Sequence, residues 1–332
     1  MTAELPFTKT IPRVSVVIPT KNGGGLFRSV LAAVVNQKTN WPFEILVIDS
    51  GSTDGTVGLV KEFPSVRLLE IPPESFGHGK TRNLGVLHTQ GEFIAFITQD
   101  ALPVNSRWLS NLTELLFTDT AVAGVFGRHL AYENASPFVK RDLTLHFDHL
   151  ASWPNPLYRS DAERYERDQG YRQVLHFFSD NNACIRRSVW QQFPYPDVNF
   201  AEDQIWAKQI IEAGFKKGYS DKGAVYHSHN YSVSETFRRA FDEAYALRQL
   251  FGYRLATSLK GSLTGAVRGT LNNWSFICSV NLPLTKRLRW ALRAPWDEIA
   301  KHLGHYLANR PGAEKFFGIV SLDNSLKTGG RQ

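Results

Sequence analysis

Five polar side chains that could bind a nucleotide or a divalent cation follow β-forming runs in the first hundred residues. They are Thr20, Asn22, Asp49, Gln99 and Asp100. In a sheet of parallel strands, ligands bind beyond the carboxyl ends of the strands, where these groups would meet. The five residues form three clusters, one after each of three strands: Thr20 with Asn22, Asp49, and Gln99 with Asp100. Turn formation and helix capping explain any one of these clusters equally well. Their recurrence after three strands favours one shared crevice.

Two adjacent acids, Glu202 and Asp203, begin a helical pattern later in the chain. A carboxylate there could accept the proton of an attacking hydroxyl if the two groups lie about 3 Å apart. The helix dipole also stabilises acids at this position without any catalytic role. Because successive helical residues point about 100° apart, only one acid of the pair faces a substrate directly. If Asp203 is the proton acceptor, Glu202 is the residue that orients the acceptor.

Two histidines, His227 and His229, stand at the end of a predicted strand near 224–227. Residues two positions apart on a strand project to the same face. Imidazole combined with carboxylate favours Mn²⁺ over Ca²⁺, so a metal site that includes Asp100 is one interpretation. A purely structural role at the strand end is the other.

Residues between 150 and 182 could bind an acceptor sugar. Asp180 and Asn181 offer polar groups for sugar hydroxyls, and aromatic rings can stack on the apolar faces of sugars. The aromatic candidates are Trp153, Tyr158, Tyr171, Phe177 and Phe178. Ordinary core packing explains Phe177 and Phe178 equally well.

The elements that would position these groups alternate between strands and helices. The predicted strands are 14–19, 43–49, 66–71 and 93–97. They are almost continuously apolar, as in a mostly parallel, doubly wound α/β sheet with helices on both faces. Between Tyr132 and Tyr171 we expect a helix followed by a long loop, and after Ser234 the pattern is helical. We therefore predict a catalytic domain over 1–250 and a helical extension over 251–332.

Two common phosphate-binding motifs are excluded. Gly23, Gly24 and Gly25 lack the G-x-G-x-x-G spacing of dinucleotide-binding proteins. Gly79-Lys80-Thr81 resembles the end of a P-loop, but position 74, where the first glycine would stand, is Glu74. The ligand is therefore expected to be neither NAD nor a P-loop nucleotide.

The net charge of +7 suits a polyanionic partner, which leaves nucleic acid, an anionic membrane and a phosphorylated substrate open. The two cysteines give no disulfide framework, and no apolar run reaches the roughly 18 residues that span a bilayer. We expect a cytoplasmic protein with, at most, peripheral contact at the inner membrane face. The basic segment 286–293, which contains Trp and Leu, fits membrane docking, a solvated face or a homo-oligomer interface.

Four motifs together resemble family-2 glycosyltransferases of the GT-A fold. They are Val16–Asn22, Val47–Thr56, Lys80–Gly85 and Ala201–Gln204. The resemblance covers about residues 13–250. Three further segments resemble the rhamnosyltransferase branch, which uses dTDP-L-rhamnose to extend bacterial surface polysaccharides. They are Phe76–Asn83, Thr98–Ala101 and Phe178–Arg186.

The resemblance implies roles for individual residues. Thr20 and Asp49 match positions that hold the base and ribose, and Arg82 matches an arginine on the base side. Asp100 matches the final Asp of the Asp-x-Asp metal motif, whose first position is Thr98 here. Asp203 matches the catalytic base. His227 is a better match than His229 to a metal-binding histidine of the family.

We therefore predict an inverting transfer, in which Asp203 deprotonates the acceptor while Mn²⁺ or Mg²⁺ at Asp100 and His227 holds the donor diphosphate. The predicted donor is dTDP-rhamnose, the predicted acceptor is a growing or lipid-linked glycan, and no nucleic acid is expected. A UDP- or GDP-sugar donor and a non-catalytic nucleotide-sugar-binding protein remain alternatives. A hydrolase would need a second carboxylate across the scissile bond, and the sequence offers no matching candidate.

Overall fold

The computed structural model describes residues 11–198, 200–313 and 315. The chain divides into two compact units. The first comprises Met1–Asn134 and Lys140–Ser228, and the second comprises Ala135–Val139 and His229–Gln332. This division precedes the predicted boundary at 250, because helix α10 (Val233–Phe251) packs against α12 (Leu284–Ala308).

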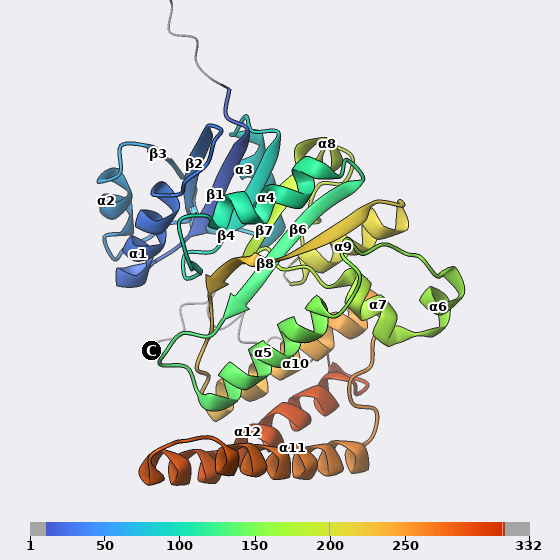
Figure 1. The fold of residues 1–332 in the computed structure, drawn as a ribbon. Helices are drawn as coiled ribbons and strands as arrows, with labels where there is room; N and C mark the ends of the chain where they lie inside the picture. Colours follow the sequence, from blue (N-terminus) through green and yellow to red (C-terminus); the bar gives the residue numbers. More distant parts are fainter. Residues whose placement is uncertain (1–10, 199, 314, 316–332) are drawn as a thin grey trace, which may run out of the picture. The chain divides into compact units, whose positions relative to one another are not determined.

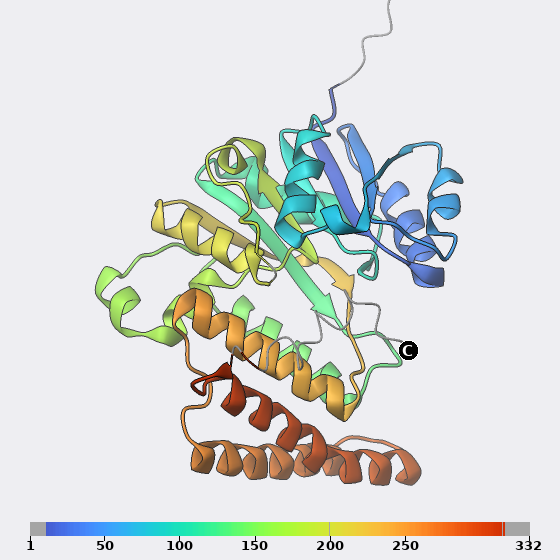
Figure 2. The same cartoon turned by 180° about the vertical axis from the view of Figure 1, so that it is seen from behind.

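One eight-stranded sheet organises the described part of the first unit (Figures 1 and 2). Its strands are β1 (Val14–Thr20), β2 (Phe43–Asp49), β3 (Val66–Glu70), β4 (Phe93–Ile97), β5 (Leu102–Pro103), β6 (Val122–Leu130), β7 (Asn182–Arg186) and β8 (Lys216–Tyr226). Their order is β3-β2-β1-β4-β7-β6-β8-β5. Strands β3, β2, β1 and β4 are mutually parallel, so their carboxyl ends share one edge. The four predicted strands are confirmed to within one residue.

Helices cover both faces of this sheet, as predicted for a doubly wound fold. They are α1 (Gly24–Val35), α2 (Thr56–Lys61), α3 (His78–Leu87), α4 (Trp108–Thr118), α5 (Pro137–Ala151), α6 (Ala162–Arg167), α7 (Gln169–His176), α8 (Arg187–Trp190) and α9 (Glu202–Glu212), with a 3₁₀ turn at Pro73–Ser75. Val16 and Ile18 of β1 pack with α1 and α4 in one core. Val17, on the other face, packs in a second core that includes residues of α3, α7 and α9. Alternate residues of one strand therefore serve two cores, which explains why these strands are apolar throughout.

One feature of the sheet was not predicted, and one prediction about the connections is wrong in part. Strand β7 runs antiparallel to both β4 and β6, and a strand that is buried on both faces carries no sequence signal for its direction. The predicted long loop before Tyr171 is wrong in part, because α6 and the start of α7 lie within it. Their N-caps Asp161 and Asp168 accept hydrogen bonds from Arg164 N and Tyr171 N. These short capped helices occupy the charged run that suggested a loop.

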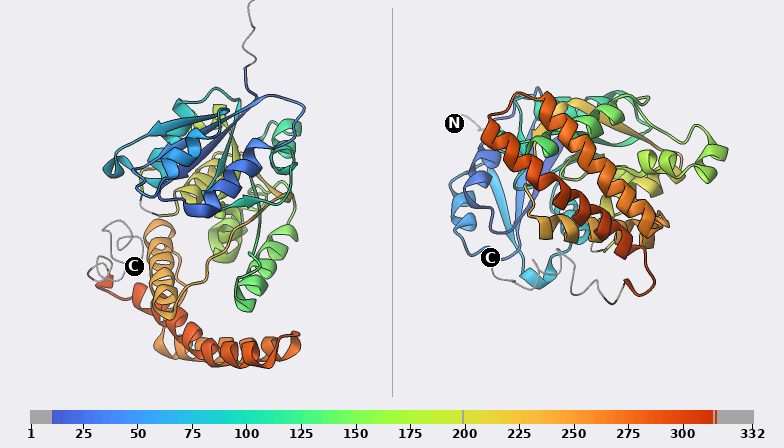
Figure 3. Two further views of the ribbon diagram at one scale, coloured as in Figure 1. Left: turned by 90° about the vertical axis from the view of Figure 1, so that its left-hand side faces the viewer. Right: turned by 90° about the horizontal axis from the view of Figure 1, so that it is seen from below.

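The second unit is built mainly of α10, α11 (Leu259–Ser279) and α12 (Leu284–Ala308), which Figure 3 shows from two further sides. A capping box at Ser232 and Glu235 starts α10. Helices α11 and α12 form an antiparallel hairpin, since Gly265 lies against His302 while Gly269 lies against Glu298. None of the helices in the described residues is long and apolar enough to cross a bilayer.

A proline interrupts the hydrogen bonding of α12. Pro295 has no N–H, so it cannot donate to the carbonyl of Ala291 one turn earlier. The indole Nε1 of Trp274, on α11, donates to that carbonyl at 2.8 Å. The neighbouring helix therefore satisfies the acceptor that the proline leaves open.

Candidate active site

The ends of β1 and β2 form the first part of the site. Thr20 and Asp49 are register partners, and Ser50 N donates to the carbonyl of Thr20 at 3.0 Å. The Asp49 carboxylate, which is buried, accepts hydrogen bonds from Gly51 N at 3.0 Å and Ser52 N at 2.9 Å, as well as from the Ser52 hydroxyl. These contacts fix the turn after β2 and hold its backbone at the sheet edge.

Gln99 joins the end of β4 to the end of β1. Its Oε1 accepts hydrogen bonds from Thr20 Oγ1 at 2.7 Å and Lys21 N at 2.8 Å, and its Nε2 donates to the carbonyl of Lys21 at 3.1 Å. All three bonds are consistent with one orientation of the amide, so the side chain is well fixed. The predicted convergence of Thr20 and Gln99 is therefore direct contact.

Asn22 continues this network towards the turn after β2. Its backbone N donates to Ser52 Oγ at 2.7 Å, and its Oδ1 accepts from Thr53 N at 2.8 Å. Its φ of 50° lies in the left-handed region, which asparagine tolerates better than most residues. Four of the side chains predicted to bind the donor, Thr20, Asn22, Asp49 and Gln99, thus share one hydrogen-bonded edge with the turn that follows β2.

Asp100 and His227 form the candidate metal centre. Oδ1 of Asp100 lies 3.5 Å from Nε2 of His227, and their side chains are 32% and 12% exposed. A carboxylate oxygen and an imidazole nitrogen at this separation suit Mn²⁺ or Mg²⁺, whose remaining ligands would be phosphate oxygens and water. His229 follows His227 by two residues, at the start of the second unit.

Two residues that the sequence analysis did not identify support this pair. Tyr132 donates its hydroxyl to the carbonyl of Asp100 at 3.0 Å. The ring of His129 packs edge-on against His227, with centroids 5.2 Å apart. Burial holds the pKa of His129 well below its usual value, so this ring is neutral and adds no positive charge beside a cation. Strand β6 is buried along most of its length and was not predicted, so no signal in the sequence marked the position of His129.

Arg82 stands at the centre of a buried charged cluster. Its Nη1 donates to Glu202 Oε1 at 2.8 Å, and its Nε lies 3.4 Å from Asp180 Oδ2. The Tyr195 hydroxyl donates to the other Asp180 oxygen at 2.9 Å. Burial raises the pKa of Asp180 to about 7, although Arg82 opposes this shift. Arg82, Asp180 and Glu202 are therefore held inside the protein, and their predicted ligand contacts stay predictions.

Asp203 lies at the start of α9, and two backbone N–H groups fix its carboxylate. Its Oδ2 accepts from Asp180 N at 3.2 Å, and its Oδ1 accepts from Gln204 N at 2.8 Å. Burial and the nearby carboxylates of Glu202 and Asp180 raise the pKa of Asp203 well above its usual value. A raised pKa makes a carboxylate a better proton acceptor, as a general base requires.

The residue before α9 has an unfavourable backbone conformation. Ala201 has a φ of 59°, and only Ala201 and Asn22 among the described non-glycine residues have positive φ. Left-handed conformation costs an L-residue about 1–2 kcal/mol, and such strain concentrates at functional sites. Asn22 is itself a predicted site residue, and Ala201 directly precedes the predicted site residues Glu202 and Asp203.

A short link connects Asp203 to Asp100. Asp180 N donates to Asp203, and the next residue, Asn181, accepts a hydrogen bond at its carbonyl from Thr98 N at 3.3 Å. Thr98 is two residues from Asp100. The metal pair and the predicted base therefore lie on the same edge of the sheet, connected through the start of β7.

Close packing and the hydrogen bonds of the Asn83 side-chain amide hold α3 beside this cluster. Asn83 donates to the carbonyl of Tyr195 at 2.8 Å and accepts from Tyr195 N at 3.0 Å and Trp190 Nε1 at 2.7 Å. A Cβ on Gly79 would lie 2.2 Å from the carbonyl oxygen of Pro196, so this approach requires glycine. Tyr195 was not identifiable from the sequence, because nothing local marks its contact with a helix more than a hundred residues away.

A family model for glycosyl transferase family 2 matches residues 15–193, more than half of the chain. The chain is a family-2 glycosyltransferase. The O-antigen chain rhamnosyltransferase RfbN of Salmonella typhimurium is 36% identical to this glycosyltransferase over 69% of the chain and 71% of the relative. WbaN, an O-antigen chain rhamnosyltransferase of Salmonella anatum, is 32% identical over 70% of the chain and 71% of the relative.

Solved structures agree on the fold of the glycosyltransferase. The mannosyltransferase PcManGT of Pyrobaculum calidifontis, in complex with GDP-Man and Mn²⁺, superposes with a TM-score of 0.57 at 20% identity, over 93% of this chain and 87% of that chain. TarS of S. aureus in complex with UDP gives a TM-score of 0.51 at 15% identity, over 88% and 90%. The predicted GT-A architecture is confirmed.

Proposed function

We propose that this glycosyltransferase moves L-rhamnose from dTDP-rhamnose onto a growing or lipid-linked glycan, with inversion at the anomeric carbon, at the inner face of the cytoplasmic membrane. One observation carries the proposal: the hydrogen-bonded edge that runs from Asp49 through Gln99 and Asp100 to Asp203. Rhamnose is supported by the two Salmonella relatives, whose names describe O-antigen rhamnosyltransferases.

In this proposal the donor nucleotide lies along the ends of β1 and β2. Thr20 and Asp49 hold the base and ribose, and Asn22 and Gln99 are further contacts of the nucleotide sugar along the same edge. Arg82 contributes from inside the protein, since its guanidinium already binds Glu202 and lies beside Asp180. Its influence on the donor then passes through α3.

Asp100 and His227 would hold a divalent cation, with His229 as a further ligand. Such a cation neutralises the charge that develops on the leaving diphosphate. The chain's own task is to fix the two donor atoms. Tyr132 fixes the backbone of Asp100, and the amide N of His227 donates to the carbonyl of Leu130 at 2.8 Å.

Asp203 accepts the proton of the acceptor hydroxyl as that oxygen bonds to the anomeric carbon, and the bond from this carbon to the diphosphate oxygen breaks. The products are the extended glycan and dTDP, with the proton on Asp203. Asp180 holds the base through its backbone N–H, and Glu202, the residue before the base, is fixed by Arg82. Asn181, at the end of the same loop, is the nearest candidate for a contact with the acceptor.

The test measures dTDP release and glycan extension by the full chain with dTDP-rhamnose and Mn²⁺. Asp203→Asn removes the base and is expected to lower the turnover number by about 10²–10⁴-fold while donor binding persists. Glu62→Gln, the same chemical change at an exposed carboxylate, is the control and keeps full activity.

A wild-type chain that binds dTDP-rhamnose and never turns it over would identify a non-catalytic binding protein. Turnover of only UDP- or GDP-sugars would reject the proposed donor. Full activity in Asp203→Asn would reject the base.

A further inference from the structure

Large apolar side chains that face solvent are concentrated in one part of the second unit. Within the described residues, thirteen of the eighteen exposed large hydrophobic side chains fall between 255 and 307. They are Leu255, Leu259, Leu263, Val267, Leu271, Trp274, Leu284, Leu288, Leu292, Trp296, Ile299, Leu303 and Leu307. Monomeric proteins rarely expose contiguous apolar patches of this extent, and larger patches mark docking sites.

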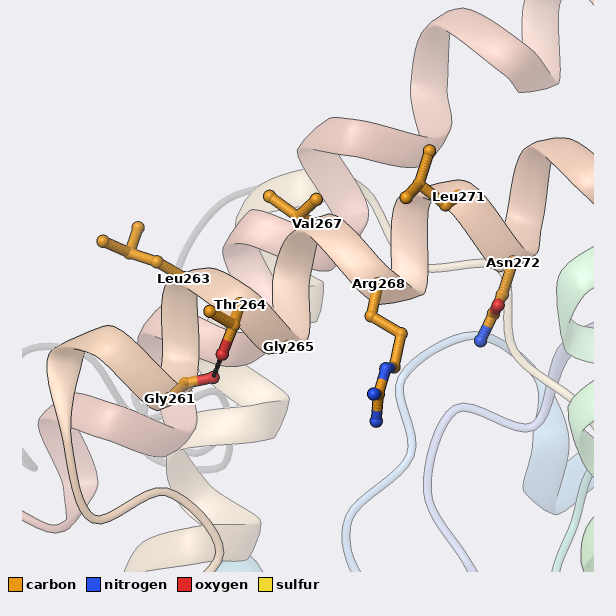
Figure 4. Close-up of a pocket in the computed structure, with 8 residues that line it drawn as sticks. All are labelled: Gly261, Leu263, Thr264, Gly265, Val267, Arg268, Leu271 and Asn272. Carbon is orange, nitrogen blue, oxygen red and sulfur yellow. Dashed lines mark hydrogen bonds between the residues drawn. The ribbon is translucent and has the colours of Figure 1, made fainter.

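The spacing of these residues places them in a stripe along each helix. From Leu259 to Trp274 on α11, and from Leu284 to Leu307 on α12, they recur every three or four residues. Figure 4 shows Leu263, Val267 and Leu271 projecting from one side of α11, while Arg268 projects from another. We call these two stripes and their connection the hairpin stripe.

The hairpin packs in the opposite sense to that of an ordinary helical pair. Much of its inner surface uses small or polar residues, such as Gly265, Ala266, Gly269 and Thr270, whereas most of its leucines face outward. A larger apolar cluster that includes Ile277 and Trp290 lies inside only near the connection between the helices. In a water-exposed hairpin the large apolar residues would be inside. Exposure of these leucines to water is unfavourable, so a second apolar medium on the outside would stabilise this arrangement.

The net charge of residues 254–313 indicates which kind of apolar medium covers the hairpin stripe. Between 254 and 313 there are nine Lys and Arg residues and two acids, a net charge of +7, which equals the formal charge of the entire chain. Both acids have basic neighbours: Asp297 accepts from Arg293 at 2.7 Å, and Glu298 lies 3.6 Å from His302. A second copy of this face would bring +7 against +7, which is repulsive.

We propose that the hairpin stripe docks on an anionic lipid bilayer, with its leucine and tryptophan side chains in the interface and its basic residues at the headgroups. Helices with an apolar stripe, abundant Lys and Arg, and no capacity to span the bilayer bind membranes in this way. The proposal deepens the proposed function, because a lipid-linked acceptor would be presented at that surface.

Flotation of the full chain with vesicles tests the proposal. Vesicles of phosphatidylcholine with phosphatidylglycerol are expected to bind the protein, and vesicles of phosphatidylcholine alone are expected to bind it far less. Added salt should release it, since charge attraction is screened. The combined variant Leu288→Ser, Leu292→Ser, Trp296→Ser is expected to lower the bound fraction by about tenfold or more.

The matched control replaces two exposed leucines of the first unit, Leu87→Ser and Leu145→Ser, and should bind like the wild type. Lys286→Gln with Arg289→Gln should weaken binding to the anionic vesicles selectively.

Three results would overturn the proposal: no binding to anionic vesicles, equal loss in the control, or equal binding to neutral vesicles. A dimer that the hairpin variant converts to a monomer, without vesicle binding by either, would identify a second copy as the occupant. Two variants separate a failure of membrane docking from a failure of the proposed transferase activity. Asp203→Asn should float like the wild type, and the hairpin variant should still transfer sugar to a water-soluble acceptor.

Discussion

Replacement of Arg82 by glutamine tests whether its guanidinium stabilises the two buried acids, Asp180 and Glu202, that lie next to the predicted base. The Arg82 side chain is 5% exposed and lies 2.8 Å from Glu202 and 3.4 Å from Asp180. Removing one partner of a buried ion pair costs about 3–5 kcal/mol, because the remaining charge stays desolvated. We expect Arg82→Gln to lower the free energy of unfolding by that amount near neutral pH, measured by urea denaturation.

The loss should depend on pH, with a sign fixed by Asp180. Its pKa is about 7 in the folded protein and 3.8 as the ordinary value, so the folded state holds a proton that the unfolded chain releases. This group's contribution to stability therefore falls as pH rises from about 4 to 7. Arg82 lowers the folded pKa, so its removal raises that pKa further and extends the fall to higher pH. The destabilisation should be larger at about pH 8 than at about pH 5.

Arg28→Gln is the matched control, since Arg28 forms an exposed pair with Glu62 and should show no measurable change. Arg82→Lys keeps the charge without the planar fork, so its loss should be intermediate. A loss below about 1 kcal/mol at pH 8, or equal losses at both pH values, would refute this account of the cluster.

Further predictions concern the metal pair, the donor edge and the strained residue. Asp100→Asn and His227→Gln should each weaken Mn²⁺ binding by about tenfold or more in a metal titration, and unchanged affinity would exclude them as ligands. Gln99→Leu should raise KM for the donor by about fivefold or more with little change in kcat. The substitution removes the three hydrogen bonds that fix the donor-binding edge, which matters equally for the bound substrate and the transition state. Ala201→Gly should raise the unfolding free energy by up to about 1 kcal/mol, since glycine accepts positive φ; a loss of stability would show that the Cβ packs favourably.

The sequence was sufficient for the parts of the fold that follow from local pattern. Strands β1, β2, β3 and β4 and the polar residues after three of them were predicted, because apolar runs and turn residues are local signals. The contact of Thr20 with Gln99 follows from strand order in a parallel sheet.

Longer-range features were not predictable in this way. The antiparallel direction of β7 depends on which strands it joins, not on its own composition. The pairing of Arg82 with Glu202 joins residues 120 positions apart, and the contact of Tyr195 with Asp180 depends on the same packing. The motifs marked Arg82 and Glu202 individually, but only the folded chain shows that they neutralise each other.

The hydrogen bond from Trp274 to the carbonyl of Ala291 has a consequence for how the two C-terminal helices align. A carbonyl opposite Pro295 that lost this donor would be costly wherever water is scarce, above all beside lipid. Only one sliding position of α11 along α12 brings the indole to this acceptor. The proline therefore specifies the register of the hairpin. Because the indole N–H of Trp274 keeps its hydrogen bond to Ala291, no unsatisfied polar group interrupts the apolar surface where Pro295 breaks the helical hydrogen bonding.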